Sequence, residues 1–158
     1  MQKFTPCLWF DTEGEDAARF YTSIFPNSRI LDVARYGEAG PRPAGTVMTV
    51  SFELDGQEFV ALNGGPQFTF SEAISFQVSC ETQEETDHSW SKLSAGGDPS
   101  AQQCGWLKDR YGVSWQILPT ALVEMLNDPD AGKSQRVMTA MLQMKKINIA
   151  ALRRAAAG

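Results

Sequence analysis

Two stretches of this chain, which begin about 70 residues apart, follow the same order of expected elements, and this repetition constrains the fold most. In each stretch a strand-like apolar run leads into a Thr-x-x-Glu sequence, at residues 12–15 and 82–85. That sequence is typical of a capping box at the start of a helix. Phe20 and Trp90 stand at the same distance after the two threonines. The period is too long for a solenoid, so we expect one supersecondary module to occur twice in a pseudo-twofold domain.

The first module is expected to fold as β-α-β-β-β. Aromatic-rich and alternating runs predict strands at residues 4–10, 28–36, 47–54 and 57–63. Ala17, Tyr21 and Ile24 recur at helical spacing and predict an amphipathic helix between the first two strands. The dipeptide Asp55-Gly56 is a strong signal for a two-residue hairpin between the last two strands.

The second module repeats the plan. We expect a strand at residues 73–80, a helix that carries Trp90 and Leu93, a short strand at 99–103 and a closing hairpin of 105–108 and 113–118. After Pro119 the pattern predicts helices at 120–127, around Val137 and Met141, and at 148–157. We therefore expect a single domain, residues 1–158, with module 1 at about 4–63, module 2 at about 73–118 and a C-terminal helical extension at about 120–157.

The charge of the chain argues against a nucleic-acid partner. Its 158 residues carry a formal net charge of −5 and the pI is about 4.9, whereas phosphate binding needs clustered Lys and Arg. The basic cluster at residues 145–146 and 153–154 falls in the helix-like tail and is interpreted as a solvated helix face. No segment is long and apolar enough to cross a membrane, and the N-terminal apolar run is too short for a signal peptide.

The cysteines and the single histidine give no pattern typical of a site. Cys7, Cys80 and Cys104 stand in or beside apolar strand-like runs, and no two of them form a C-x-x-C pair. Such an odd, unspaced set indicates reduced thiols, buried among apolar residues, in a cytoplasmic protein. His88 falls on the second expected helix and is expected to be exposed.

Several segments are similar to one known superfamily. PCLWFD, ARFYTSIFPNS, LDGQEFVALNGGPQFTF and above all CGWLKDRYGVSWQILP, together with the tail VMTAMLQMKKINIAAL, resemble the glyoxalase/bleomycin-resistance superfamily, also called vicinal oxygen chelate. The subgroup that these segments resemble is the phosphonate-operon B-like, or "3-demethylubiquinone-9 3-methyltransferase", domain. The resemblance implies an α+β fold of two βαβββ modules whose curved mixed sheets form a cleft, with C-terminal helices added here, and usually a homodimer.

Metal-dependent members of the superfamily bind an ion through histidines on the first strand of each module and carboxylates on the last strands. Carried over one by one, those places fall at Pro6, at Ala61 or Asn63, near Ala73 and at Gln116. Zn²⁺, Ni²⁺ and Fe²⁺ need imidazole, thiolate or carboxylate ligands in convergent geometry, which these residues do not supply. We therefore expect no metal and no other cofactor.

Strand alternation predicts which side chains line the cleft. If Gln116 faces it, Ser114 does too, and Trp115 faces the helix layer. The resulting candidates for ligand binding are Leu8, Phe10, Asn63, Ser75, Gln77, Trp106, Ser114 and Gln116. Amides and hydroxyls among apolar groups suit an uncharged or weakly polar small molecule. Two alternatives stay open: Gln116 either contacts a ligand or only hydrogen-bonds across the sheet, and Trp106 either stacks on a ligand or only packs.

Three functions remain open. The first is a metal-free homodimer that binds a small molecule of unknown identity. The second is an enzyme, because the subgroup's label names a methyl transfer. However, the chain shows no glycine-rich loop after a strand that would hold S-adenosylmethionine, and no convincing carboxylate pair for acid–base chemistry, so no catalytic residue is identified. The third is an interaction protein that uses its Met-rich C-terminal helices.

Overall fold

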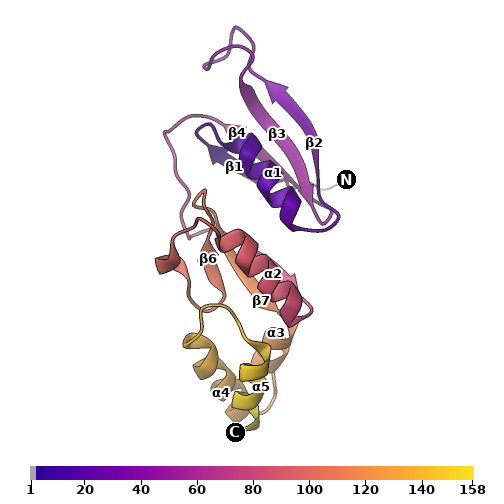
Figure 1. The fold of residues 1–158 in the computed structure, drawn as a ribbon, viewed down its shortest axis with the longest axis vertical. Coiled ribbons are helices and arrows are strands. Elements are labelled where there is room, and N and C mark those ends of the chain that lie inside the picture. The colour runs from indigo at the N-terminus through magenta and orange to yellow at the C-terminus, as the bar shows by residue number, and fades with distance from the viewer. Residues whose placement is uncertain (1–2) are drawn as a thin grey trace. The chain divides into compact units, whose positions relative to one another are not determined.

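The computed structural model describes residues 3–158, which form two compact units, the first ending at Phe70 and the second covering Ser71–Gly158. Each unit is described by itself, and a cleft shared by the two sheets stays a prediction. The elements in chain order (Figure 1) are β1 (Cys7–Phe10), α1 (Gly14–Ile24), β2 (Arg29–Arg35), β3 (Val47–Leu54), β4 (Gln57–Asn63), β5 (Ser75–Cys80), α2 (Gln83–Ser94), the short 3₁₀ helix η1 (Pro99–Ala101), β6 (Trp106–Lys108), β7 (Ser114–Pro119), α3 (Thr120–Leu126), α4 (Ala131–Leu142) and α5 (Ile149–Ala157).

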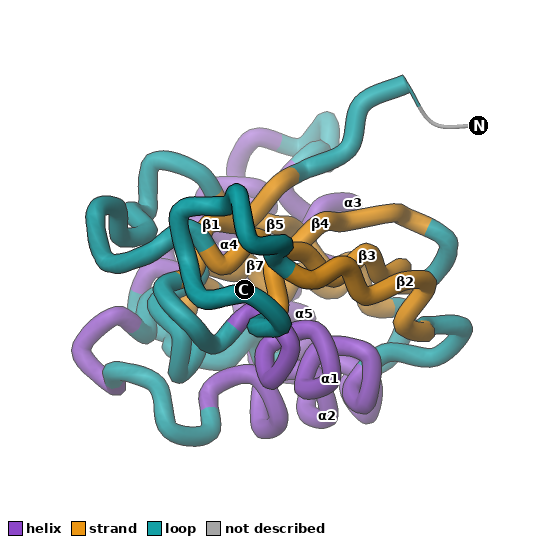
Figure 2. Tube along the Cα trace, turned by 90° about the horizontal axis from the view of Figure 1, so that it is seen from above, coloured by secondary structure: helices purple, strands orange, loops and turns teal. Residues whose placement is uncertain are grey.

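The first unit is a four-stranded mixed sheet with α1 packed on one face. Its strand order is β1-β4-β3-β2 (Figure 2). β1 is parallel to β4, and the other pairs are antiparallel. Phe52 stacks on Tyr21 of α1 and on Phe59 of β4, with ring centroids 6.2 and 5.4 Å apart. Asp55 and Gly56 have φ of 46° and 84°, as a type I′ turn requires. The predicted hairpin is therefore confirmed.

The predicted capping box at residues 12–15 is wrong. Helix α1 begins at Gly14, and its N-cap residue, Glu13, makes no side-chain cap hydrogen bond. The Gly14 N–H instead donates to Oδ1 of Asn63, 2.8 Å away on β4. A Cβ on residue 14 would lie 2.6 Å from that oxygen, so the close approach requires glycine. Since Asn63 Nδ2 also donates to the Val47 carbonyl at 3.2 Å, one amide joins the helix start to two strands.

The second unit repeats the first with one strand fewer. Its sheet has the order β5-β7-β6, with β5 parallel to β7 and β6 antiparallel to it. The predicted capping box at α2 is confirmed, because Thr82 Oγ1 accepts from the Glu85 N–H at 3.1 Å. The Glu85 carboxylate in turn accepts from the Glu81 N–H at 2.8 Å.

The predicted strand at residues 99–103 is wrong. Residues 99–101 form η1, and of this segment only Gln103 pairs, in an isolated bridge to Trp106. Pro99 has no N–H to donate to a strand ladder. Asp98 Oδ1 accepts from the Ser100 N–H at 2.9 Å and caps the short helix instead.

The β6–β7 hairpin is organised by one buried carboxylate. Asp109 Oδ1 accepts from the N–H groups of Tyr111 and Val113 at 2.8 and 3.1 Å. Its Oδ2 accepts from the Trp115 indole at 2.9 Å. Gly112 completes the turn with φ of 88°. Much of the distinctive sequence at residues 104–119 therefore serves to build this turn.

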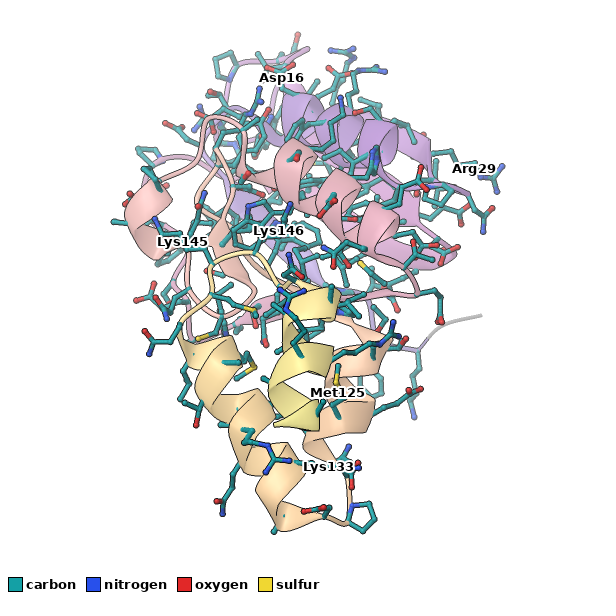
Figure 3. The ribbon with its side chains drawn as sticks, turned by 60° about the horizontal axis from the view of Figure 1, so that its bottom comes forward. Asp16, Arg29, Met125, Lys133, Lys145 and Lys146 are labelled. Carbon is teal, nitrogen blue, oxygen red and sulfur yellow. The ribbon has the colours of Figure 1, made fainter. Side chains whose placement is uncertain are left out.

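The C-terminal helices α3, α4 and α5 belong to the second unit and pack around an apolar cluster of their own. Leu122, Val137, Ile147 and Leu152 are its fully buried members. Met125, labelled in Figure 3, is among the partly buried residues packed against them. No helix among residues 3–158 is long and apolar enough to span a membrane.

The cysteines differ in burial although none forms a disulfide among the described residues. Cys80 is buried, Cys104 is half-buried and Cys7 is exposed. The prediction that all three are buried is therefore wrong for Cys7, which lies on the open side of the edge strand β1. Burial raises the pKa of the Cys80 thiol. His88 is exposed, as expected.

Candidate functional site

The second sheet carries five of the predicted site residues on one face. Register pairs Ser75 with Ser114 and Gln77 with Gln116, and it places Trp106 opposite Gln116. Directly paired residues point to the same face of a sheet. The opposite face carries buried residues such as Trp115 and is covered by α2. The five residues therefore share the sheet face opposite α2, as strand alternation predicted, and that this face lines a cleft stays a prediction.

The predicted orientation is wrong for the first module. Leu8 pairs with Ala61, and Phe10 pairs with Asn63. Asn63 bonds the start of α1, so all four side chains share the helix-covered face, where each is buried. Leu8, Phe10 and Asn63 therefore do not line the open face of the first sheet. Strand alternation holds here too, but the contact of Asn63 with the start of α1 decides which face of this sheet is covered.

A pocket of about 710 Å³ lies on the open face of the second sheet. Trp106, Lys108 and Ser114 line it from β6 and β7, and Cys104 lines it from the segment before β6. Its other lining residues include Glu72, Asp98, Ser100, Gln103, Met141 and Leu142. Two predicted residues, Trp106 and Ser114, thus lie in the pocket. Ser75, Gln77 and Gln116 lie on the same sheet face outside its lining.

The Ser114 hydroxyl is the most distinctive group in this pocket. Ser114 is 2% exposed, and its Oγ has no hydrogen-bond partner among the described residues. A buried hydroxyl without a partner costs free energy, so such groups are rare in folded proteins. The Ser114 hydroxyl, which is closed off from solvent, therefore keeps an unused donor and acceptor within a residue that lines the pocket.

Charged groups of both signs stand beside Ser114. Lys108 Nζ lies 2.7 Å from Glu72 Oε2. The hydrogen bond and charge of Lys108 hold the pKa of Glu72 below its usual range. Hydrogen bonds from Ser100 likewise lower the pKa of Asp98. At neutral pH the ammonium group is already paired and two carboxylates are ionised, which does not favour a strongly anionic ligand.

The residues at the superfamily's metal-ligand positions do not fit a divalent ion. Gln116 Nε2 donates to Ser75 Oγ at 2.9 Å, so this amide bridges β7 and β5. Asn63 is engaged at the start of α1. Pro6 and Ala73 have no donor atom in their side chains. Among residues 3–158, no group of three His, Cys, Asp or Glu side chains is placed to hold a metal ion.

Sequence reasoning missed part of the pocket for two different reasons. Lys108 stands two residues after Trp106 on the same strand, so alternation alone could have placed it on the open face. Met141 and Leu142 lie on α4, more than twenty residues beyond the sheet in the chain. No local pattern indicates that a helix from the extension reaches this face.

Two repeated modules, each with a helix on one face of a mixed sheet and its first and last strands parallel, define the glyoxalase/bleomycin-resistance class of fold. The family described as 3-demethylubiquinone-9 3-methyltransferase matches residues 2–118, and the chain belongs to this family. No match was found among curated proteins. The family match ends at Leu118, so helices α3, α4 and α5 lie beyond it.

Solved structures agree with this assignment. A PhnB protein from Bacillus cereus is 42% identical to the chain, with a TM-score of 0.66 over 75% of this chain and 99% of that one. A protein from Pseudomonas aeruginosa is 18% identical, with a TM-score of 0.60 over 75% of this chain and 98% of that one. A glyoxylase/bleomycin resistance protein/dioxygenase domain from Frankia is 16% identical, with a TM-score of 0.50 over 75% and 92%. The last two show likeness of fold alone.

Proposed function

We propose that this protein binds an uncharged or weakly polar small molecule in the pocket on its second sheet. The observation that carries the proposal is the buried, unpartnered hydroxyl of Ser114 in a pocket of about 710 Å³. A pocket of this size suits a small organic ligand. A ligand that hydrogen-bonds Ser114 would remove the cost of leaving that group unsatisfied.

The other lining groups define the class of ligand. Trp106 offers an aromatic surface on the open face of the sheet. Lys108 is neutralised by Glu72, so it does not act as a free anion-binding site. The ligand we propose therefore has an aromatic or branched apolar part and at least one hydrogen-bonding group.

From the family resemblance we also propose that the protein is a cytoplasmic homodimer. Sedimentation of the purified protein tests the oligomeric state.

A thermal-shift screen tests the binding function. The panel contains quinones, aromatic antibiotics, phosphonates and S-adenosylmethionine, applied to wild type, Ser114→Ala, Trp106→Leu and Ser79→Ala. Ser79 is the matched control because it is exposed on the same face of β5 outside the pocket lining. A true ligand raises the Tm of wild type and Ser79→Ala, and raises it less in the two pocket variants.

Two results of that screen would count against the proposal. Equal stabilisation of all four proteins would place the ligand elsewhere. Stabilisation by S-adenosylmethionine alone would favour the methyl transfer that the family description names.

A further inference from the structure

We infer that the C-terminal extension forms one wall of the ligand pocket, and that helix α4 selects the apolar part of the ligand. This inference rests on the function proposed above. Met141 and Leu142, near the end of α4, line the same pocket as Ser114 and Trp106. Because the family match ends at residue 118, this wall comes from outside the matched core. The core supplies the polar groups and the extension supplies an apolar surface.

Hydrogen bonds hold the last residue of α4 and the residues after it against the segment just before β6. The N–H groups of Cys104 and Gly105 donate to the carbonyls of Met144 and Lys145, both at 2.8 Å. Gln103 Nε2 donates to the Leu142 carbonyl, also at 2.8 Å. Leu142 itself is held by one of these hydrogen bonds, and Met141 lies three residues before Met144, which accepts another. The two residues of the pocket wall are therefore anchored close to their own positions.

A second set of contacts holds the chain just beyond α4. Gln83 on α2 donates through Nε2 to the Ile147 carbonyl at 3.0 Å and accepts through Oε1 from the Ile149 N–H at 2.7 Å. Lys146 Nζ lies 2.8 Å from Asp87 Oδ1 on the same helix. The segment with Lys145 and Lys146, labelled in Figure 3, is thus tied to Gly105, just before β6, and to α2. Gln83 does not line the pocket, so it acts on the pocket only by positioning the wall.

The chemistry of this wall narrows the class of ligand. Leu142 is 50% exposed and lines the pocket, so part of its apolar side chain is open to a bound molecule. Met141 has a flexible thioether, which packs well against aromatic rings. Ser114 provides the hydrogen-bonding group on the sheet. We therefore assign the pocket to neutral aromatic molecules that carry one hydrogen-bonding group.

Titration with N-phenyl-1-naphthylamine, a neutral fluorescent aromatic amine, tests the inference on the full chain. Met141→Ala removes the wall, Gln83→Leu removes both bonds of the positioning amide, and Ser114→Ala removes the polar contact. Met138→Ala is the matched control, because Met138 is an exposed methionine on the same helix outside the pocket lining. We expect Met141→Ala to raise the Kd about tenfold, Gln83→Leu to raise it in the same direction, and Met138→Ala to leave it unchanged.

Alkylation of Cys104 by iodoacetamide locates the bound probe. Cys104 lines the pocket, so saturating probe should slow its labelling in wild type, while labelling of the exposed Cys7 stays unchanged. The same protection should be weaker in Met141→Ala. Mass spectrometry of the two peptides gives both rates from one sample, and it does not depend on how each variant affects fluorescence.

The outcomes separate the two proposals. If Ser114→Ala weakens binding but Met141→Ala and Gln83→Leu do not, the role of the extension is overturned and the proposed function stands. If wild type shows no saturable binding, or the probe leaves Cys104 unprotected, both proposals are overturned, because the probe has the chemistry that they name.

Discussion

Ser114 and Asn63 are both buried polar residues, but the structure uses them in opposite ways. The Asn63 side chain donates one hydrogen bond and accepts another within the first unit. The Ser114 Oγ has no partner within the described residues. A satisfied buried group stabilises the fold, whereas an unsatisfied one destabilises it. Substitution of the two residues should therefore change stability in opposite directions.

The first prediction concerns Ser114→Ala. Removal of an unpartnered buried hydroxyl should leave the free energy of unfolding unchanged or raise it by about 1 kcal/mol, because the desolvation cost disappears. Urea denaturation of the ligand-free protein measures this change. A loss of more than about 1 kcal/mol would mean that the hydroxyl has a structural partner and would remove the main support for a ligand role.

The second prediction concerns Asn63→Ala. It removes the acceptor for the Gly14 N–H and leaves the Val47 carbonyl without its side-chain donor, so we expect a loss of about 2–3 kcal/mol in the free energy of unfolding. Asn148→Ala is the control, because Asn148 caps α5 at an exposed position and should cost about 1 kcal/mol. Equal losses in the two variants would contradict the view that Asn63 joins the helix to the sheet.

At the scale of elements, the sequence predicted correctly those turns and helix caps that depend only on residues close in the chain. The Asp55-Gly56 turn and the Thr82 cap are set within a few residues, and both are confirmed. The start of α1 depends on Asn63, 49 positions away, and no local pattern contains that information. Pro99 is a local signal against a strand, because it has no N–H for a strand ladder, and the structure follows that signal.

The docking of the extension on α2 should weaken in acid. Hydrogen bonds from Lys146 and Gln83 hold the pKa of Asp87 below its usual range. A carboxyl whose pKa is lower in the folded state stabilises the fold above its unfolded pKa, and that contribution is lost as pH falls through the folded value. Hydrogen exchange in α5 should therefore speed up between about pH 5 and pH 3, after correction for intrinsic rates.

Asp87→Asn provides the control for this third prediction. It removes the titrating group but keeps an acceptor for Lys146 and Gln83, so the extra acid sensitivity of α5 should shrink in the variant. The ion pair is partly exposed, so added salt should also weaken the contact in wild type. Identical pH profiles in the two proteins would show that Asp87 does not contribute.

At the scale of the whole molecule, the two units depart from repetition where the extension is attached. The first sheet has a fourth strand, β2, whereas the corresponding part of the second unit forms η1. The segment that follows η1 bonds to the end of α4 and the residues after it through Gln103, Cys104 and Gly105. The sequence repeat predicted two similar modules and the open face of the second sheet. It did not predict the pocket wall, because that wall depends on tertiary contacts between segments about 40 residues apart.

The last prediction asks whether the extension and the second sheet unfold together. Leu152 is fully buried in the apolar cluster of the extension, so Leu152→Ala should cost about 3 kcal/mol. If the contacts at residues 103–105 couple the two parts, amide exchange should speed up in β6 and β7 as well as in α3, α4 and α5. Arg153→Ala, at the exposed neighbouring position, should change neither region. Faster exchange confined to the extension would show that the extension is a separate cooperative unit. A pocket wall that opens independently of the sheet could not select the ligand.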